Sequence, residues 1–172
     1  MWSRFDSAVL VALGGNLKGG FASCELLLEA ALDRFAEAGL LIRDRSNWWR
    51  SAAWPDPNEP SYLNGAAIIE TALPPAATLA ALHAVEERFG RVRGQPNAPR
   101  TLDLDLIAYG RVVSLETPPI LPHPRAAERL FVMGPLVEIA PDWVHPVLGE
   151  TAADLAARAP VGRDAAPLHS KS

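Results

Sequence analysis

The chain has 172 residues, of which 49% are hydrophobic and 21% are charged, which is close to ordinary globular usage. This length corresponds to one domain that buries roughly 70% of the surface of the unfolded chain, so collagen-like, coiled-coil and wholly disordered classes are excluded. The net charge of −4 argues against non-specific binding to nucleic acids or membrane surfaces, because such binding needs a basic surface.

The first forty residues predict a strand and a helix. Ser7–Leu13 is a short apolar run typical of a buried strand, and Gly14-Gly15-Asn16 is expected to end it in a turn. Apolar residues recur at helical spacing from Phe21 to Ala38, with Gly39 as the expected C-cap. Leu40–Arg50 is predicted as the second strand.

The middle of the chain combines a proline-rich loop with regular elements. Ser51–Ser61 contains three prolines, which exclude a helix interior or a central strand, so a long loop is expected. Tyr62–Thr71 is predicted as a strand. A helix is expected to begin at Pro74-Pro75 and to run to Phe89, because proline suits the first helical turn and Gly90 can end the helix.

The second half begins with an irregular stretch over residues 91–100. Thr101–Tyr109 is predicted as a strand by strict alternation, and Arg111–Val113 is expected to return as a hairpin. Arg125–Ile139 is the third predicted helix. The segment 152–172 is expected to be an alanine-rich tail whose last residues fray, within a single domain that spans residues 1–172.

This order of elements is β-α-β-β-α-β, followed by a hairpin and an additional helix. It predicts an α+β, ferredoxin-like fold, in which helices pack on a mostly antiparallel sheet. The single Cys24 excludes an internal disulfide and is expected to be a buried, inert thiol. The N-terminus does not resemble a signal peptide and no apolar run is long enough to span a membrane, so a cytoplasmic location is expected.

The strongest chemical signal is Asp103-Leu104-Asp105. On a strand the two carboxylates point to one face, while Leu104 points to the core. Two carboxylates about 7 Å apart repel each other unless a cation lies near them, and Mg²⁺ binds one or two carboxylates together with water and phosphate oxygens. The alternative interpretation is a solvated strand face.

A cationic stretch precedes this pair. It comprises four arginines and contains no acidic residue between positions 88 and 102: Arg88, Arg91, Arg93 and Arg100. Arginines beside a carboxylate metal site suit a polyphosphate, because they neutralise charge that shifts during phosphoryl transfer. The alternative is ordinary ion pairing with Glu86 and Glu87.

Three weaker signals lie elsewhere. The helical pattern places Glu86 on or beside a buried face, where an arginine of the next loop or a substrate hydroxyl could pair with it. Tyr62 and Asn64 share a strand face, where an amide and an aromatic ring could hold a flat heterocycle or simply pack. His123 lies between two prolines and could bind a phosphate or be solvated.

Together these motifs resemble 6-hydroxymethyl-7,8-dihydropterin pyrophosphokinase, an enzyme family of folate biosynthesis. The most specific match is the run Pro99–Leu106, and the similarity extends from about Val9 to Gly149. The other matching motifs are Gly14-Gly15-Asn16-Leu17, Tyr62-Leu63-Asn64, Glu86–Arg93, Leu121–Arg125 and Pro135–Pro141.

The resemblance implies that the β,γ-diphosphate of ATP is transferred to the hydroxymethyl oxygen of the pterin, with release of AMP. It implies two Mg²⁺ ions held by Asp103 and Asp105, and transfer assisted by Arg91 and Arg100. Family members are commonly monomers. The resemblance places His83, Glu86, Arg93, Leu106, Ile120, His123 and Arg129 on the nucleotide side, and Ser51, Trp54, Tyr62, Asn64 and Phe131 on the pterin side.

The sequence departs from the family pattern in the loop between Arg93 and Arg100, which is one residue shorter and has Pro96-Asn97 in place of a common Arg-Trp pair. Two other interpretations follow from the residues. A non-catalytic pterin- or nucleotide-binding module would explain the altered loop but would not need all four residues Arg91, Arg100, Asp103 and Asp105. A ferredoxin-like RNA-binding domain would need a basic sheet face, which the acidic composition disfavours.

Overall fold

A computed structural model describes residues 5–53, 56, 58, 60–90 and 102–168. Its centre is an antiparallel sheet in which β1 pairs with β4 on one side and with β5 on the other. Two short strands, β2 and β3, pair with successive parts of β4, and β6 pairs with β3. The strands are β1 (Val9–Gly15), β2 (Leu41–Arg45), β3 (Trp49–Ser51), β4 (Tyr62–Glu70), β5 (Asp103–Tyr109) and β6 (Ala166–Pro167).

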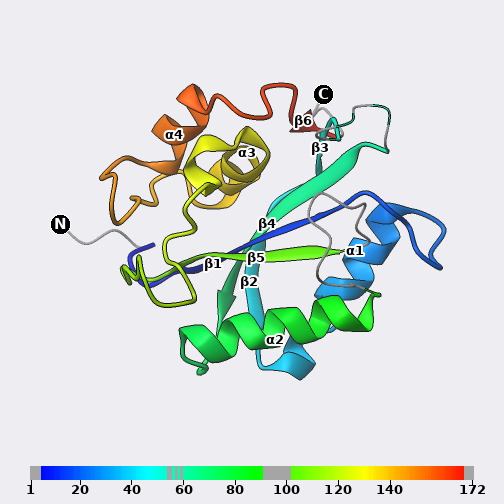
Figure 1. The fold of residues 1–172 in the computed structure, drawn as a ribbon, viewed down its shortest axis with the longest axis horizontal. Helices are drawn as coiled ribbons and strands as arrows, with labels where there is room; N and C mark the ends of the chain where they lie inside the picture. Colours follow the sequence, from blue (N-terminus) through cyan, green and yellow to red (C-terminus); the bar gives the residue numbers. More distant parts are fainter. Residues whose placement is uncertain (1–4, 54–55, 57, 59, 91–101, 169–172) are drawn as a thin grey trace.

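Helices cover both faces of this sheet (Figure 1). Figure 1 shows α1 and α2 on one face and α3 and α4 on the other. The expected antiparallel sheet with helices packed on it is confirmed. The helices are α1 (Cys24–Leu32), α2 (Pro75–Arg88), α3 (Leu130–Ile139) and α4 (Ala152–Arg158), and the 3-10 turns are η1 (Ala36–Ala38) and η2 (Ala126–Glu128).

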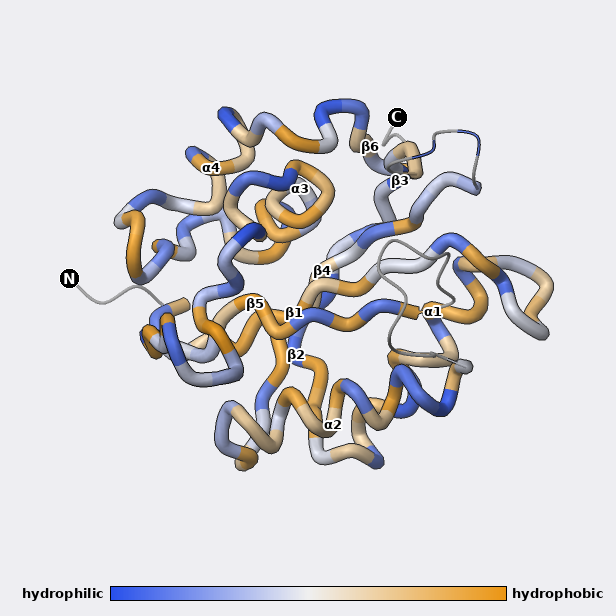
Figure 2. Tube along the Cα trace, viewed as in Figure 1, coloured by the Kyte–Doolittle hydropathy of each residue, from blue (hydrophilic) through white to orange (hydrophobic). Residues whose placement is uncertain are grey.

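The alternation of side chains along β1 explains this layering. Val9, Val11 and Leu13 point into the core formed with α1 and α2, whereas Leu10 and Ala12 point into the core formed with α3 and α4. Because a strand buried on both faces must be apolar at every position, β1 is a continuous hydrophobic run. Figure 2 shows hydrophobic segments in β1 and β5 between the two helical layers, with hydrophilic and hydrophobic residues alternating in the first half of β5.

The strands and the helix predicted around the site are confirmed with small shifts. β4 ends one residue before the predicted Thr71, and α2 begins at Pro75 with Gly90 in a left-handed conformation (φ 89°) just beyond its end. β1 includes Gly14 and Gly15, which were expected to form a turn, because they continue the ladder with β4 opposite Asn64 and Leu63.

Two predicted elements of the first half were too long. The helix expected over Phe21–Ala38 is shorter. It begins at Cys24 because Ser23 caps α1 by accepting a hydrogen bond from the Leu26 N–H at 3.1 Å, and beyond Leu32 hydrogen bonds between residues three apart lead into η1. The strand expected over Leu40–Arg50 is divided into β2 and β3. Between β2 and β3, the Ala66 N–H of β4 donates to the side-chain hydroxyl of Ser46, which takes the place of a backbone carbonyl on a neighbouring strand.

The predicted hairpin was wrong. Arg111–Val113 form no strand, because the Arg111 guanidinium donates to the Val144 carbonyl and holds this segment against the connection between α3 and α4. The helix predicted over Arg125–Ile139 is interrupted at Arg129, whose extended ψ of 114° separates η2 from α3.

The segment after Thr151 contains regular structure. Thr151 caps α4 by accepting from the Asp154 N–H, and β6 then joins the sheet edge. The expected fraying of the last residues falls on 169–172, outside the described residues. Cys24 is half-buried, where full burial was expected, and burial raises the pKa of its thiol to about 11, which disfavours the reactive thiolate. Within the described part of the chain, no helix has the length and apolar character needed to cross a membrane.

Candidate active site

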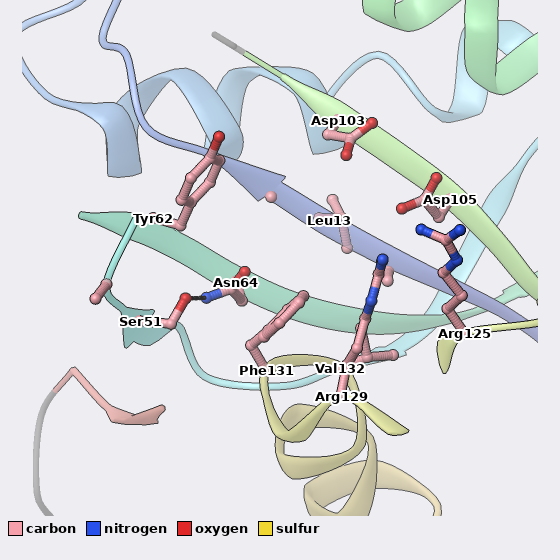
Figure 3. Close-up of a pocket in the computed structure, with 13 residues that line it drawn as sticks. Leu13, Ser51, Tyr62, Asn64, Asp103, Asp105, Arg125, Arg129, Phe131 and Val132 are labelled. Carbon is pink, nitrogen blue, oxygen red and sulfur yellow. Dashed lines mark hydrogen bonds between the residues drawn. The ribbon is translucent and has the colours of Figure 1, made fainter. Parts of the chain in front are cut away.

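A cavity of about 220 Å³ opens on the sheet face that carries α3 (Figure 3). Side chains from β1, β3, β4 and β5 form one side, and the chain from η2 into α3 forms the other. The residues that line it are Ala12, Leu13, Gly14, Ser51, Ala52, Tyr62, Asn64, Asp103, Asp105, Arg125, Arg129, Phe131 and Val132.

The two carboxylates enter this cavity together, as the alternation along the strand predicts. Asp103 and Asp105 point to the cavity face of β5, whereas Leu102, Leu104 and Leu106 are each at most 4% exposed on the opposite face. Figure 3 shows both carboxylates directed toward the same space. Both side chains are partly exposed and line the cavity, and the metal-binding interpretation of the pair stays a prediction.

Two arginines face the carboxylates across the cavity. Arg125 precedes η2 and Arg129 precedes α3, and Figure 3 shows both guanidinium groups extending toward the side occupied by Asp103 and Asp105. The Arg129 guanidinium also lies 5.6 Å from the centroid of the Phe131 ring, in a cation–π arrangement. Opposite charges therefore meet at one end of the cavity.

The other end of the cavity combines aromatic rings with a hydrogen-bonding amide. Tyr62 and Asn64 share one face of β4, as predicted, and Phe131 faces them from α3 (Figure 3). Asn64 is 6% exposed, and its Nδ2 donates to the Ser51 Oγ at 2.9 Å. Two rings with a fixed amide between them can hold a flat, polar heterocycle.

The floor between the two ends contains a glycine. In the strand register Gly14 of β1 lies opposite both Asp103 of β5 and Asn64 of β4. Adjacent strands are about 4.8 Å apart, so the backbones of Asp103 and Asn64 are roughly 10 Å apart across this glycine. Because glycine has no side chain, the space above Gly14 stays open and joins the two ends.

His123 lies at the edge of this charge cluster. Its backbone N–H donates to the Ile107 carbonyl at 2.8 Å, and its Nδ1 accepts from the Arg125 N–H at 3.3 Å. Burial and then the charge of Arg129 lower its pKa, against the opposing effect of Asp103. The lowered pKa favours the neutral ring, and a neutral ring whose Nδ1 accepts this hydrogen bond carries its proton on Nε2.

Glu86 has a position that the sequence only partly indicated. It is 1% exposed, and its Oε2 accepts from the Leu104 N–H at 2.8 Å. This bond ties α2 to β5 between the two aspartates. The predicted burial is confirmed. The Leu104 N–H is a partner that the sequence analysis did not consider, and the loop arginine and the substrate hydroxyl stay predicted partners.

The remaining predicted residues divide into two groups. Leu106 is buried in the core beneath β5, His83 and Ile120 are half-buried, and none of the three lines the cavity. Four predicted residues lie outside the described part of the chain: Trp54, Arg91, Arg93 and Arg100.

Six lining residues were not among the predicted site residues: Ala12, Leu13, Gly14, Ala52, Arg125 and Val132. Arg125 belongs to the matched Leu121–Arg125 motif, and its position two residues after His123 was the available signal. Gly14 belongs to the matched Gly14-Gly15-Asn16-Leu17 motif, but its position between Asp103 and Asn64 follows only from the pairing of β1 with β4 and β5.

The fold and the cavity define an α+β protein with a carboxylate–arginine site beside a pocket for an aromatic ring. A sequence model of one family, 7,8-dihydro-6-hydroxymethylpterin-pyrophosphokinase (HPPK), matches residues 10–141. The chain belongs to this family. It is 40% identical over 149 residues to the 2-amino-4-hydroxy-6-hydroxymethyldihydropteridine pyrophosphokinase of Synechocystis sp., covering 83% of this chain and 71% of that protein.

Another relative supports the same assignment, and a solved structure shares the fold. The enzyme of the same name from Methylorubrum extorquens is 34% identical over 149 residues, covering 86% of this chain and 90% of that protein. The crystal structure of wild-type Plasmodium falciparum HPPK-DHPS shares the fold, with a TM-score of 0.67 at 14% identity over 87% of this chain. The chain spans only 44% of that longer chain.

Proposed function

We propose that this protein transfers the β,γ-diphosphate of ATP to the hydroxymethyl oxygen of 6-hydroxymethyl-7,8-dihydropterin, giving the pterin diphosphate and AMP. The observation that carries the proposal is that one cavity has two chemically different ends. The carboxylates and arginines suit a polyphosphate, and the amide between two aromatic rings suits a pterin. Family membership independently supports the same reaction.

At the ring end, Tyr62 and Phe131 would contact the faces of the pterin. One N–H of the Asn64 amide is used by Ser51, which leaves the carbonyl oxygen and the second N–H to match the polar edge of the heterocycle. A hydroxymethyl group on the far edge of such a ring would point past Gly14 toward Asp103. Trp54 remains a predicted contact of the same ring.

At the charged end, Asp103 and Asp105 would hold Mg²⁺. The donors fit, because Mg²⁺ binds one or two carboxylates and completes its coordination with water and phosphate oxygens. When bound, the cation neutralises phosphate charge and helps to orient the triphosphate. The two ions expected from the resemblance are part of this proposal.

The cationic side chains would stabilise the charge that moves during transfer. The hydroxymethyl oxygen attacks the β-phosphorus, its proton is lost, and the bond from the β-phosphorus to the oxygen of the α-phosphate breaks as AMP leaves. Arg129 faces this region, and the neutral His123 ring can donate from Nε2 to a phosphate oxygen. Arg91 and Arg100 are predicted to assist, and His83, Glu86, Arg93, Leu106 and Ile120 to form the nucleotide side.

We further propose that the fold is ferredoxin-like and that the chain is one domain and a monomer. The β-α-β-β-α-β order of β1, α1, β2, β4, α2 and β5, with the sheet order β5-β1-β4-β2, supports the fold. Light scattering during size-exclusion chromatography measures the mass in solution, and a mass of twice 18.5 kDa would contradict the monomer.

The deciding experiment measures AMP release with ATP, Mg²⁺ and 6-hydroxymethyl-7,8-dihydropterin. AMP that forms only when all three are present is the expected result. ADP as the nucleotide product would overturn the proposed bond cleavage. Calorimetric binding of both ligands without any turnover would favour the non-catalytic module instead.

A further inference from the structure

The segment of residues 159–168, called here the C-terminal strap, returns from α4 to the outer edge of the sheet (Figure 1). It lies beyond residues 10–141, the part of the chain matched by the family model. It nevertheless contacts two of the elements that form the ring end of the cavity, α3 and β3. The strap therefore connects two walls that are far apart in the sequence.

The first contact is with the start of α3. The Leu130 N–H donates to the Val161 carbonyl at 2.9 Å, and the Val161 N–H donates to the Glu128 carbonyl at 3.0 Å. Gly162 follows in a left-handed conformation (φ 73°), and a Cβ at this position would lie 2.5 Å from Cδ1 of Phe131. The Phe131 ring therefore packs directly against the backbone of Gly162, and any side chain there would displace it.

The second contact is with the end of β3. The Asp164 carboxylate accepts a hydrogen bond from the Ala52 N–H at 2.6 Å, a charge-assisted bond to a residue that lines the cavity next to Ser51. Ala166–Pro167 then pairs with Trp49 and Arg50, and the Leu168 N–H donates to the Trp48 carbonyl at 2.9 Å. The strap thus fixes the backbone where the long loop leaves the sheet.

We infer that Gly162 and Asp164 are positioning residues for the flat heteroaromatic substrate, because together they set the separation between the Phe131 ring and the Ser51–Ala52 wall. This inference rests on the proposed function. Neither residue needs to touch the substrate. Gly162 determines where the ring of Phe131 lies, and Asp164 determines where the backbone of Ala52 lies, so these two residues act on ring binding. The strap reaches the carboxylate–arginine end through a different residue, Val161, which pairs with the backbone on both sides of Arg129.

The first test compares Asp164→Ala with Asp164→Asn. Alanine removes the acceptor for the Ala52 N–H, whereas the asparagine carbonyl retains it. Asp164→Ala is expected to raise KM for the pterin by about tenfold, the effect of roughly one lost hydrogen bond, with KM for ATP and kcat within about twofold of wild type. Asp164→Asn is expected to restore KM for the pterin, and Asp142→Ala on the turn after α3 serves as the matched control.

A second test does not depend on catalysis, so the inference can still be refuted if the Asp164→Ala variant folds poorly. Amide hydrogen exchange of Ala52 is expected to accelerate in Asp164→Ala and to stay slow in Asp164→Asn. Gly162→Ala is expected to weaken pterin binding in calorimetry and to leave Mg·ATP binding unchanged. Gly20→Ala, where a Cβ would meet nothing within 4 Å, is its control.

The outcomes separate two failures. If wild type neither binds nor turns over the pterin, the proposed function is overturned and this inference with it. If wild type is active but the Asp164 and Gly162 variants keep wild-type KM for the pterin, the positioning role alone is overturned. Equal losses for pterin and ATP would show that the strap only stabilises the fold, and would also overturn the positioning role.

Discussion

The Nδ2 of Asn64 donates to the Oγ of Ser51 at 2.9 Å, and this bond fixes the orientation of the Asn64 amide at the ring end of the cavity (Figure 3). The two residues are on neighbouring strands, where Ser51 pairs with Tyr62 and Trp49 pairs with Asn64. Specificity for a heterocycle edge depends on such a fixed amide, because a freely rotating amide offers donor and acceptor in either order.

Replacement of Ser51 by alanine is therefore expected to raise KM for the pterin by about five- to tenfold, corresponding to the loss of one orienting hydrogen bond. Ser51→Thr keeps the hydroxyl and is the matched control. Steady-state kinetics with each substrate varied in turn measures the effect. A larger change in KM for ATP than in KM for the pterin would contradict the assigned orientation.

Asp103→Asn and Asp105→Asn are each expected to abolish Mg²⁺-dependent nucleotide binding, because an amide keeps the shape of the carboxylate but loses the charge that holds the cation. Calorimetric titration of a non-hydrolysable ATP analogue, with and without Mg²⁺, measures this. Asp44→Asn, on exposed β2, is the control. Metal dependence that stays unchanged in both cavity variants would refute the metal site.

Glu86→Ala is expected to lower the free energy of unfolding by at least about 1–3 kcal/mol, because it leaves the buried Leu104 N–H without the acceptor at 2.8 Å. Glu86→Gln keeps an acceptor oxygen and is expected to be less destabilised. Urea unfolding followed by tryptophan fluorescence compares the two variants. Equal losses would show that the carboxylate charge, rather than the bond to Leu104, determines stability.

Gly134 of α3 lies against the Trp49 ring, and a Cβ there would be 2.5 Å from Cζ3 of the indole. Trp49 is held in place because its Nε1 donates to Glu138 at 2.6 Å. Gly134→Ala is therefore expected to destabilise the protein by about 1–3 kcal/mol, despite the better helix propensity of alanine. Thermal unfolding measures this, with Gly20→Ala as the control, and a stabilised Gly134→Ala variant would contradict the close packing.

His145 makes stability dependent on pH. Its Nδ1 accepts from the N–H groups of Val147 and Leu148, and burial and then the charge of Arg111 lower its pKa below 6.5. A lowered folded-state pKa means that the unfolded chain binds more protons as the pH falls. The stabilising contribution of the neutral His145 is therefore present above pH 6.5 and is lost as the pH falls through its folded-state pKa.

The His145→Asn variant is expected to flatten this part of the profile, because an asparagine oxygen accepts the same hydrogen bonds without titrating. Urea unfolding at intervals from pH 8 to pH 5 measures the slope in wild type and variant. Identical slopes in the two proteins would show that another group causes the pH dependence.

The sequence by itself determined the features that depend on one strand or one helix. Alternation placed Asp103 and Asp105 on one face and Leu102, Leu104 and Leu106 on the other, because successive side chains of a strand point to opposite faces whatever the strand pairs with. The same rule put Tyr62 and Asn64 together. The helix α2 followed from its proline start and its glycine end.

Only the tertiary structure decided the features that depend on partners distant in sequence. Gly14 became the floor between Asp103 and Asn64 through the register of β1 with two other strands, and Arg129 interrupted a helix that local propensity favoured. The C-terminal strap acquired its position from hydrogen bonds to Ala52 and Leu130. Such contacts arise from packing among separate elements, for which local periodicity carries no signal.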